Sequence, residues 1–313
     1  MSPSLAHLTR GLAHLTRGLR HLTRRDWVLL AAAAPLAARA NGSRIACQCY
    51  VFEQDYGARK EKTIDRVDEI LSTVAAAGYH AVELTSSYFP PDKTAESLAL
   101  LDKHGLALPI AYTGGPMHDD RWHQTYDSAL AYADRLKPHK GLEAISFNCD
   151  PKPRSEAKTD AELATEARAL EQLGASLKHR GLRLLVHAHA PEMADHAREW
   201  RYFFHHTTAA SVGICLDTHW VYRGGENVLE ILREAGTRIG DIHLRNSANG
   251  IWLEEFAAGD VDYAVVAAEL KKLRYEGWLT VELAWDPKTE RTRALVEDLK
   301  RSREYTERMF GAV

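Results

Sequence analysis

Four side chains that commonly bind metal ions, His187, Asp217, His243 and Glu282, each close a short apolar run. The runs read Leu-Leu-Val-His, Ile-Cys-Leu-Asp, Asp-Ile-His and Thr-Val-Glu. The four residues lie 30, 26 and 39 positions apart, a spacing that fits strand-plus-helix units. A ring of parallel strands would therefore bring them together as a metal site.

The chemistry of such a site follows from its ligand types. Two imidazoles and two carboxylates suit Mn²⁺, Co²⁺, Fe²⁺ or Zn²⁺ better than Ca²⁺. We expect one divalent cation at this site, and the candidates are Mn²⁺, Co²⁺, Zn²⁺ and Mg²⁺. A cation that holds two neighbouring sugar oxygens polarises the carbonyl and stabilises the enediolate that forms when the adjacent carbon loses a proton. Glu282 is the predicted base for that proton.

The elements that must position these residues alternate along the chain. Short apolar runs are separated by longer stretches with helical apolar spacing, as in Val67, Ile70, Leu71 and Val74. This alternation predicts a parallel sheet, and eight units favour closure into a single-domain (β/α)₈ TIM barrel over residues 41–313. The predicted strands are 45–52, 81–84, 106–112, 144–148, 182–187, 212–216, 239–244 and 278–283.

Glycines mark the ends of the predicted helices. A glycine tolerates the left-handed conformation that often ends a helix. An open, doubly wound sheet is the alternative, but no Gly-x-Gly-x-x-Gly follows the first predicted strand. The glycines concerned are Gly78, Gly105, Gly141, Gly181, Gly236 and Gly277.

The N-terminus has the composition of an export signal. Residues 1–25 contain five arginines and no acidic residue, residues 28–38 are apolar, and Ala38-Arg39-Ala40 provides small residues for cleavage. The stretch Thr23-Arg24-Arg25-Asp26-Trp27-Val28-Leu29 resembles the twin-arginine signal. We expect residues 1–40 to be a signal peptide and the protein to be exported to the periplasm or beyond the cytoplasm; an Arg-rich leader or a wrongly assigned start codon is the alternative.

Charge and composition exclude several other classes. Removal of residues 1–40 leaves 34 basic and 42 acidic residues, a net charge of −8, which argues against nucleic-acid binding. No later apolar run is long enough for stable membrane insertion. Cys47, Cys49, Cys149 and Cys215 fall in or beside apolar runs and are expected to be small buried side chains rather than a disulfide or metal set.

Several of these segments together resemble the xylose isomerase-like TIM barrels. They are 181–189 (Gly-Leu-Arg-Leu-Leu-Val-His-Ala-His), 242–246 (Ile-His-Leu-Arg-Asn), 259–263 (Gly-Asp-Val-Asp-Tyr) and 277–282 (Gly-Trp-Leu-Thr-Val-Glu). That superfamily includes sugar phosphate isomerase/epimerases, ketose 3-epimerases, inosose isomerases and dehydratases, and dehydroshikimate dehydratases. The resemblance extends over about residues 44–310.

The resemblance implies a role for each predicted ligand. Relatives hold a divalent metal with Glu, Asp, His and Glu from strands five to eight, which correspond here to His187, Asp217, His243 and Glu282. His187 departs from this pattern, so a symmetric epimerisation with two carboxylates loses one partner. Relatives that metabolise inososes carry a His-x-His similar to His187-Ala-His189. His187 is accordingly a predicted ligand and second acid/base group, and His189 a predicted substrate contact.

Other strand-end residues are candidate substrate contacts. His219 follows Asp217 by two, where relatives have Asp-x-x-His, and would share the side of Asp217 if the strand continued. Arg245 stands where relatives have lysine and would bind a substrate oxygen or the enolate, or else pair with Glu254 or Glu255. Glu83 and Trp220 complete the set, as a strand-end carboxylate and an aromatic wall.

Three further positions receive less specific expectations. Glu192 competes with His187 as the fifth-strand ligand, although capping the following helix explains it better. His118 and His123 are expected to be surface groups.

The predicted function is a divalent-metal-dependent isomerase or epimerase acting on a keto-sugar or related polyol ketone. A dehydratase or lyase that expels a β-substituent from the same enolate is the nearest alternative, and a non-catalytic sugar-binding barrel is the alternative of another class. The expected partner is a small-molecule sugar, and a homo-oligomer is possible.

Overall fold

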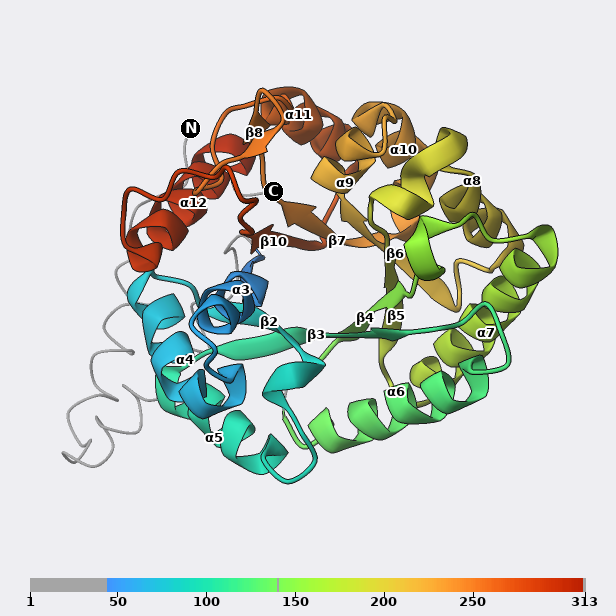
Figure 1. Cartoon of the computed structure of the whole chain (residues 1–313), viewed down its shortest axis with the longest axis horizontal. Helices are drawn as coiled ribbons and strands as arrows, with labels where there is room; N and C mark the ends of the chain where they lie inside the picture. The colour runs from blue at the N-terminus through green and yellow to red at the C-terminus, as the bar shows by residue number, and fades with distance from the viewer. Residues whose placement is uncertain (1–43, 140, 312–313) are drawn as a thin grey trace, which may run out of the picture. The chain divides into compact units, whose positions relative to one another are not determined.

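A closed barrel of parallel strands forms the centre of the protein (Figure 1). The computed structural model describes residues 44–139 and 141–311, so the predicted signal peptide lies outside the described residues. Going round the barrel, the strand order is β1-β10-β7-β6-β5-β4-β3-β2. The barrel strands are β1 (Ile45–Gln48), β2 (Ala81–Thr85), β3 (Ala107–Gly115), β4 (Ala144–Cys149), β5 (Arg183–His187), β6 (Val212–Asp217), β7 (Ile239–Leu244) and β10 (Trp278–Glu282).

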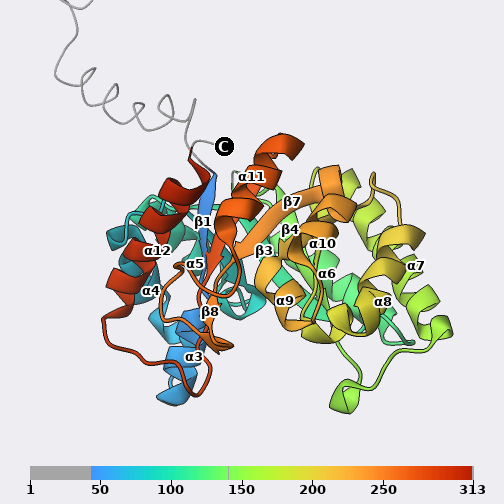
Figure 2. The ribbon, with the colours of Figure 1, turned by 90° about the horizontal axis from the view of Figure 1, so that it is seen from above.

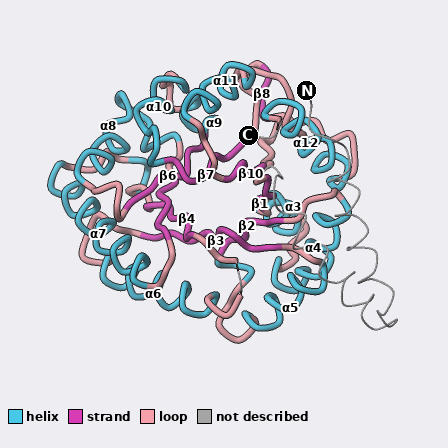
Figure 3. Tube along the Cα trace, turned by 180° about the vertical axis from the view of Figure 1, so that it is seen from behind, coloured by secondary structure: helices cyan, strands magenta, loops and turns pink. Residues whose placement is uncertain are grey.

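Helices surround the strands (Figures 2 and 3). A short antiparallel pair, β8 (Ser247–Ala248) and β9 (Ile251–Trp252), lies in the loop after β7. The helices are α3 (Tyr50–Ala58), α4 (Val67–Ala76), α5 (Thr94–His104), α6 (Trp122–Leu136), α7 (Asp160–His179), α8 (Ala190–His206), α9 (Thr218–Arg223), α10 (Val228–Ala235), α11 (Tyr263–Leu273) and α12 (Leu295–Phe310). The short 3₁₀ helices are η2 (Thr63–Arg66), η3 (Ser86–Tyr88), η4 (Pro153–Ser155) and η5 (Gly236–Arg238). The predicted (β/α)₈ TIM barrel is confirmed.

Apolar side chains fill two regions of the barrel. The larger core lies between strands and helices; in α4, for example, the predicted apolar face of Val67, Ile70, Leu71 and Val74 is buried. A smaller cluster consists of Ile110, Ala144, Leu185 and Cys215, with Trp278 packed against it. His187, Asp217 and Glu282 are the last residues of β5, β6 and β10, at the carboxyl ends of the strands, where active sites of this fold lie.

The first predicted strand was too long. β1 ends at Gln48, and α3 begins at Tyr50 inside the apolar run that suggested a strand to residue 52. The side chain of Gln48 accepts a hydrogen bond from the backbone N–H of Tyr50, which turns the chain into the helix. Cys47 and Cys49 are buried free thiols, as expected, and so are Cys149 and Cys215.

Five of the six glycines that were expected to end helices have the positive φ angle on which the expectation was based. Gly78, Gly105, Gly141, Gly181 and Gly236 all have positive φ angles. Gly277 does not belong with them, because Arg274 takes the left-handed conformation at the end of α11. A Cβ atom at Gly277 would instead lie 2.6 Å from the backbone oxygen of Gly240, so this glycine permits close packing.

Within the described ranges, no helix is both long and apolar enough to cross a lipid bilayer.

Candidate metal and substrate site

The four predicted ligands converge at the carboxyl ends of β5, β6, β7 and β10. One candidate ligand atom from each of His187, Asp217, His243 and Glu282 lies within 4.8 Å of all the others, and all four residues are buried. The Nε2 atom of His187 lies 3.7 Å from Oδ2 of Asp217. The Nδ1 atom of His243 lies 3.0 Å from Oε2 of Glu282. This group could bind a metal ion.

Asp217 is held in place by the helix that follows it. Its Oδ1 atom accepts hydrogen bonds from the backbone N–H groups of His219 and Trp220, at 2.9 and 2.8 Å, and so caps α9. The cap leaves Oδ2 facing the site. Burial alone would raise the pKa of Asp217, but the charge of Arg245 and the nearby imidazoles hold it well below its usual value.

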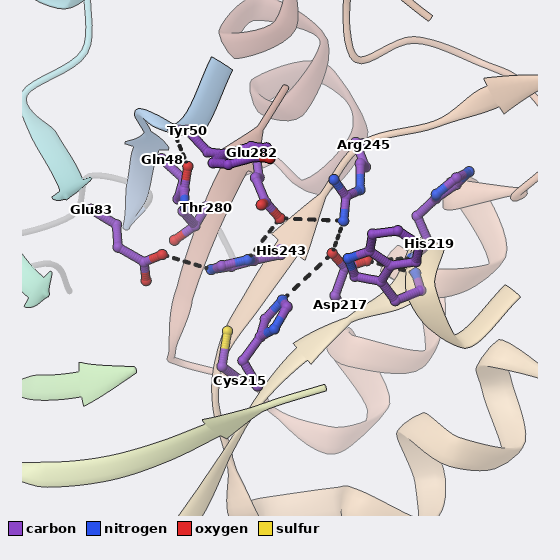
Figure 4. A network of polar contacts seen from close by, with 12 residues as sticks. Gln48, Tyr50, Glu83, Cys215, Asp217, His219, His243, Arg245, Thr280 and Glu282 are labelled. Carbon is purple, nitrogen blue, oxygen red and sulfur yellow. Dashed lines mark hydrogen bonds and ion pairs between the residues drawn. The ribbon is translucent and has the colours of Figure 1, made fainter. Parts of the chain in front are cut away.

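His243 lies between carboxylates on both sides (Figure 4). Its Nδ1 atom faces Glu282, and its Nε2 atom lies 3.1 Å from Oε1 of Glu83 and 3.3 Å from Oδ2 of Asp241. Burial lowers the pKa of His243, but Cys215, Glu83 and Asp241 more than offset that effect, so its pKa lies well above its usual value.

A second polar layer lies two residues earlier on the same strands. Asp241 precedes His243 by two, and its oxygens accept from the Thr280 hydroxyl at 2.7 Å and the Cys215 thiol at 3.6 Å. Glu83 joins this layer from β2, fully buried, and among the described residues its only ion pair is the one with His243, 3.1 Å from Oε1. Burial raises the pKa of Glu83 to about 7, although His243 opposes the shift.

Arg245 extends into the carboxylate pair. Its Nη2 atom donates to Oδ2 of Asp217 at 2.6 Å and lies 3.5 Å from Oε2 of Glu282. The indole rings of Trp220 and Trp252 lie 4.7 and 4.8 Å from the guanidinium carbon. The alternative pairing of Arg245 with Glu254 or Glu255 was wrong, because those two carboxylates pair with Arg293 and Arg301.

His187 lies in a small cluster of aromatic rings beside the other candidate ligands. The rings of His187 and His189 lie 4.7 Å apart, and the Tyr112 hydroxyl lies 3.4 Å from Nδ1 of His187. Burial lowers the pKa of His187, and burial together with His187 lowers the pKa of His189 to about 3. Both imidazoles are therefore neutral near pH 7 and able to bind a metal or exchange a proton.

The strand argument for His219 was wrong. β6 ends at Asp217, so His219 belongs to α9 and strand alternation does not orient it. Its Nε2 atom lies 2.9 Å from the Ser247 hydroxyl, which donates to Asp260 at 2.6 Å. Trp220, the other α9 candidate, lies 5.3 Å from the ring of His189 and therefore stands close to the four-residue group.

Glu192, His118 and His123 were the less specific expectations. Glu192 caps α8 as expected, because its carboxylate accepts from the backbone N–H of His189 at 2.8 Å. The surface placement of His118 was wrong: only 4% of the residue is exposed, whereas His123 is exposed as expected.

Sequence reasoning missed Asp241 and Tyr112. Asp241 interrupts an apolar strand two positions before a predicted ligand, and the two-residue alternation of strands would have placed it beneath His243. Tyr112 lies within β3 in a run that reads as ordinary apolar strand.

The side chains present fit a divalent cation. Four buried carboxylates, Glu83, Asp217, Asp241 and Glu282, each lie within 3.5 Å of His243 or Arg245. Among the described residues, the buried Nε2 atom of His187 has no hydrogen-bond partner. Nδ1 of His243 faces the ligand group while its Nε2 faces Glu83 and Asp241, which matches the outer carboxylate that normally orients a metal-bound histidine.

The fold and this buried N/O ligand group define a parallel (β/α)₈ barrel with a candidate metal centre at its carboxyl end. Residues 71–305 match the family described as Xylose isomerase-like TIM barrel, and the chain belongs to that family.

Relatives and solved structures agree with this assignment. The chain is 25% identical over 253 residues to an inosose dehydratase of Geobacillus kaustophilus, covering 70% of this chain and 80% of the relative. It is 26% identical over 256 residues to an inosose dehydratase of Clostridium perfringens, covering 73% and 84%. A solved L-ribulose 3-epimerase superposes with a TM-score of 0.69 at 16% identity, covering 86% of this chain and 95% of that one. A D-allulose 3-epimerase from Methylomonas sp., solved with D-allulose, gives 0.68 at 18% identity, covering 86% and 98%. At these identities the structural likeness supports the fold alone.

Proposed function

We propose that this protein is a divalent-metal-dependent enzyme that removes a proton next to the carbonyl of a keto-sugar or related polyol ketone. The observation that carries the proposal is the position of Glu282 in a buried group of candidate metal ligands. Its Oε2 atom accepts from His243 at 3.0 Å, and within the described part of the chain its Oε1 atom makes no hydrogen bond.

Glu282 has the protonation state of a base. Burial tends to raise its pKa, but the charge of Arg245 and the bond from His243 bring the pKa below its usual value. Glu282 is therefore ionised near neutral pH and accepts the proton from the substrate carbon through Oε1. Arg245, buried 2.6 Å from Asp217, supplies positive charge beside the developing enediolate.

His187, Asp217, His243 and Glu282 would hold the metal ion. When bound, a divalent cation would polarise the substrate carbonyl and lower the cost of enolate formation.

Among the reactions that share this enolate, loss of a β-substituent is the one that the site favours. Epimerisation through two carboxylates needs a second catalytic Glu or Asp, whereas β5 ends at His187 in this chain, with His189 and Tyr112 beside it. The leaving hydroxyl needs a proton donor, and the Tyr112 hydroxyl can supply the proton because burial raises its pKa and keeps it protonated. The inosose dehydratases among the relatives support this choice.

Isomerisation or epimerisation is the second candidate. His187 approaches both Asp217, at 3.7 Å between Nε2 and Oδ2, and His243, at 4.9 Å between ring centres, so an imidazole stands where a second acid/base group is needed. It would return the proton to the opposite face or to the neighbouring carbon.

The same proposal includes export. The Arg-rich segment and the small residues at 38–40 support a twin-arginine signal over residues 1–40. Because sugar phosphates are mainly cytosolic, export favours an unphosphorylated keto-sugar.

Incubation of the metal-loaded protein with an inosose and with free ketohexoses in D₂O tests the proposal. Deuterium gain without other mass change indicates isomerisation or epimerisation, and loss of water indicates dehydration. Glu282→Gln should abolish both signals, while Glu297→Gln, at a half-exposed glutamate of α12, should keep them. Equal activity of wild type and Glu282→Gln would refute the proposal.

A further inference from the structure

Arg245 contacts the same two oxygens that a metal ion would share. Its Nη2 atom lies 2.6 Å from Oδ2 of Asp217 and 3.5 Å from Oε2 of Glu282. Oδ2 of Asp217 is also the oxygen nearest His187, and Oε2 of Glu282 is the oxygen bonded to His243. The guanidinium therefore stands at the edge of the group in which all four ligand atoms lie within 4.8 Å.

The contact of Arg245 with the carboxylates uses one nitrogen only. Arginine usually grips a carboxylate with two parallel N–H bonds. Here Nη2 alone donates to Asp217, and the buried Nε atom finds no hydrogen-bond partner among the described residues. Such a single-point contact fixes the guanidinium less firmly than a fork would.

Two tryptophans also contact the guanidinium in its present position. Trp220 and Trp252 present their rings 4.7 and 4.8 Å from its central carbon, and the two rings stand nearly perpendicular at 78° with centres 5.5 Å apart. Buried arginine gains from aromatic faces as well as from carboxylates. The guanidinium can thus give up its hydrogen bond to Asp217 and stay in contact with the two indole rings. Its charge would then still face aromatic rings and not a purely apolar environment.

We propose that Arg245 is a built-in counter-ion that occupies the cation position of the Asp217–Glu282 pair and is displaced toward Trp220 and Trp252 when a divalent metal binds. The inference rests on the proposed metal site. In this role Arg245 sets the affinity for the metal, independently of any contact with substrate. When no metal is bound, the arginine reduces the repulsion between the two carboxylates. When metal is present, the arginine competes with it for the same carboxylates.

The physical reason is charge. Two buried carboxylates that approach one another repel unless a cation lies between them. A guanidinium near the metal position repels the metal ion because both are positively charged. The low dielectric constant of a buried site strengthens this repulsion and the repulsion between the carboxylates. Removal of the guanidinium should therefore destabilise the metal-free protein and tighten metal binding.

Calorimetric titration of chelator-treated protein with MnCl₂ alone tests this inference. We expect Arg245→Gln to bind Mn²⁺ at least about tenfold more tightly than wild type, because a like charge beside the cation has gone. Its metal-free melting temperature should fall, and saturating Mn²⁺ should recover most of the loss. Arg223→Gln is the matched control, since Arg223 also faces Trp252, at 6.0 Å, but its Nη1 atom donates to the backbone of Gly250 rather than to a carboxylate of the site.

The outcomes separate the two proposals. Failure of both wild type and Arg245→Gln to bind Mn²⁺ refutes the metal site itself. Binding by wild type with equal or weaker binding by a folded Arg245→Gln refutes the counter-ion role and makes Arg245 a support of the ligands. If Arg245→Gln accumulates only when Mn²⁺ is present during expression, the cation has replaced the arginine, as proposed; insolubility in Mn²⁺ as well counts against it.

Discussion

Replacement of Glu83 by glutamine should strengthen the metal-free fold and weaken metal binding at the same time. Glu83 is fully buried in the middle of β2, and its Oε1 atom pairs with Nε2 of His243 at 3.1 Å. Glu83→Gln keeps the shape of the side chain and removes its charge. The variant should therefore gain stability but lose affinity for the metal. A residue that serves only packing would not show this combination.

The effect on stability follows from the pKa of Glu83. Burial raises this pKa from 4.5 to about 7, so the folded protein holds the proton more tightly than the unfolded chain. The fold is therefore penalised as the pH rises from 4.5 to about 7, and the penalty is complete above that range. At about 1.4 kcal/mol per pKa unit, the penalty reaches about 3 kcal/mol at alkaline pH. We expect Glu83→Gln to raise the free energy of unfolding of the metal-free protein by about 1–3 kcal/mol at about pH 8, and by less at about pH 5.

The effect on metal binding follows from the orientation of His243. A carboxylate that accepts the second N–H of a metal-bound imidazole raises its basicity, and loss of such a partner typically costs 10–100-fold in affinity. Asp241 remains 3.3 Å from the same nitrogen, so we expect a loss of about tenfold.

Chemical denaturation at the two pH values and calorimetric Mn²⁺ titration measure the two effects. Asp298→Asn is the control, since Asp298 of α12 is also a buried carboxylate whose pKa burial raises, to about 6, but its partner is Arg293 rather than a candidate metal ligand. By the same reasoning that control should gain stability at alkaline pH, and it should keep its Mn²⁺ affinity. A Glu83→Gln variant that is less stable at alkaline pH, or that binds Mn²⁺ as tightly as wild type, would refute the reasoning.

Three other outcomes can be measured independently. Chelation should lower the melting temperature, because metal at about 100 times its Kd contributes about 2.7 kcal/mol; an unchanged melting temperature would speak against a bound metal. Glu282→Gln should reduce kcat about 10²–10⁴-fold as a lost general base, while circular dichroism stays native; a small loss would assign proton removal to another group. Lys158→Met should destabilise the fold by about 3–5 kcal/mol, because Glu166, 2.6 Å from the Lys158 ammonium, would lose its buried partner; its Mn²⁺ affinity should stay at the wild-type value.

The barrel and the four-residue group could be predicted because strand ends carry a strong signal. An apolar run that stops at a carboxylate or imidazole shows both where a strand ends and which way its last side chain lies. This held for Asp217 and Glu282, where β6 and β10 end at the predicted residue. It failed for β1, because the local hydrogen bond from Tyr50 to the Gln48 side chain turns an apolar stretch into helix.

Contacts between side chains from distant elements were beyond the sequence. Arg245 had carboxylates near it in the chain, Glu254 and Glu255, yet it bonds to Asp217 from another strand. The choice depends on the β8–β9 loop, which places Trp252 against the guanidinium while Arg293 and Arg301 bind the nearer glutamates. No pairwise spacing in the sequence encodes that competition.

The two polar layers of the barrel explain how a fully buried imidazole can serve a metal. Cys215 and Asp217, Asp241 and His243, and Thr280 and Glu282 are residue pairs two apart on adjacent strands, so each strand contributes one group to each layer. The deeper layer ties Asp241 to Thr280 and Cys215, and thereby fixes the acceptor beneath His243. His243 then presents Nδ1 upward to Glu282. Because the deeper layer fixes the imidazole, the upper layer is left to present the carboxylate oxygens of Asp217 and Glu282 as candidate ligands.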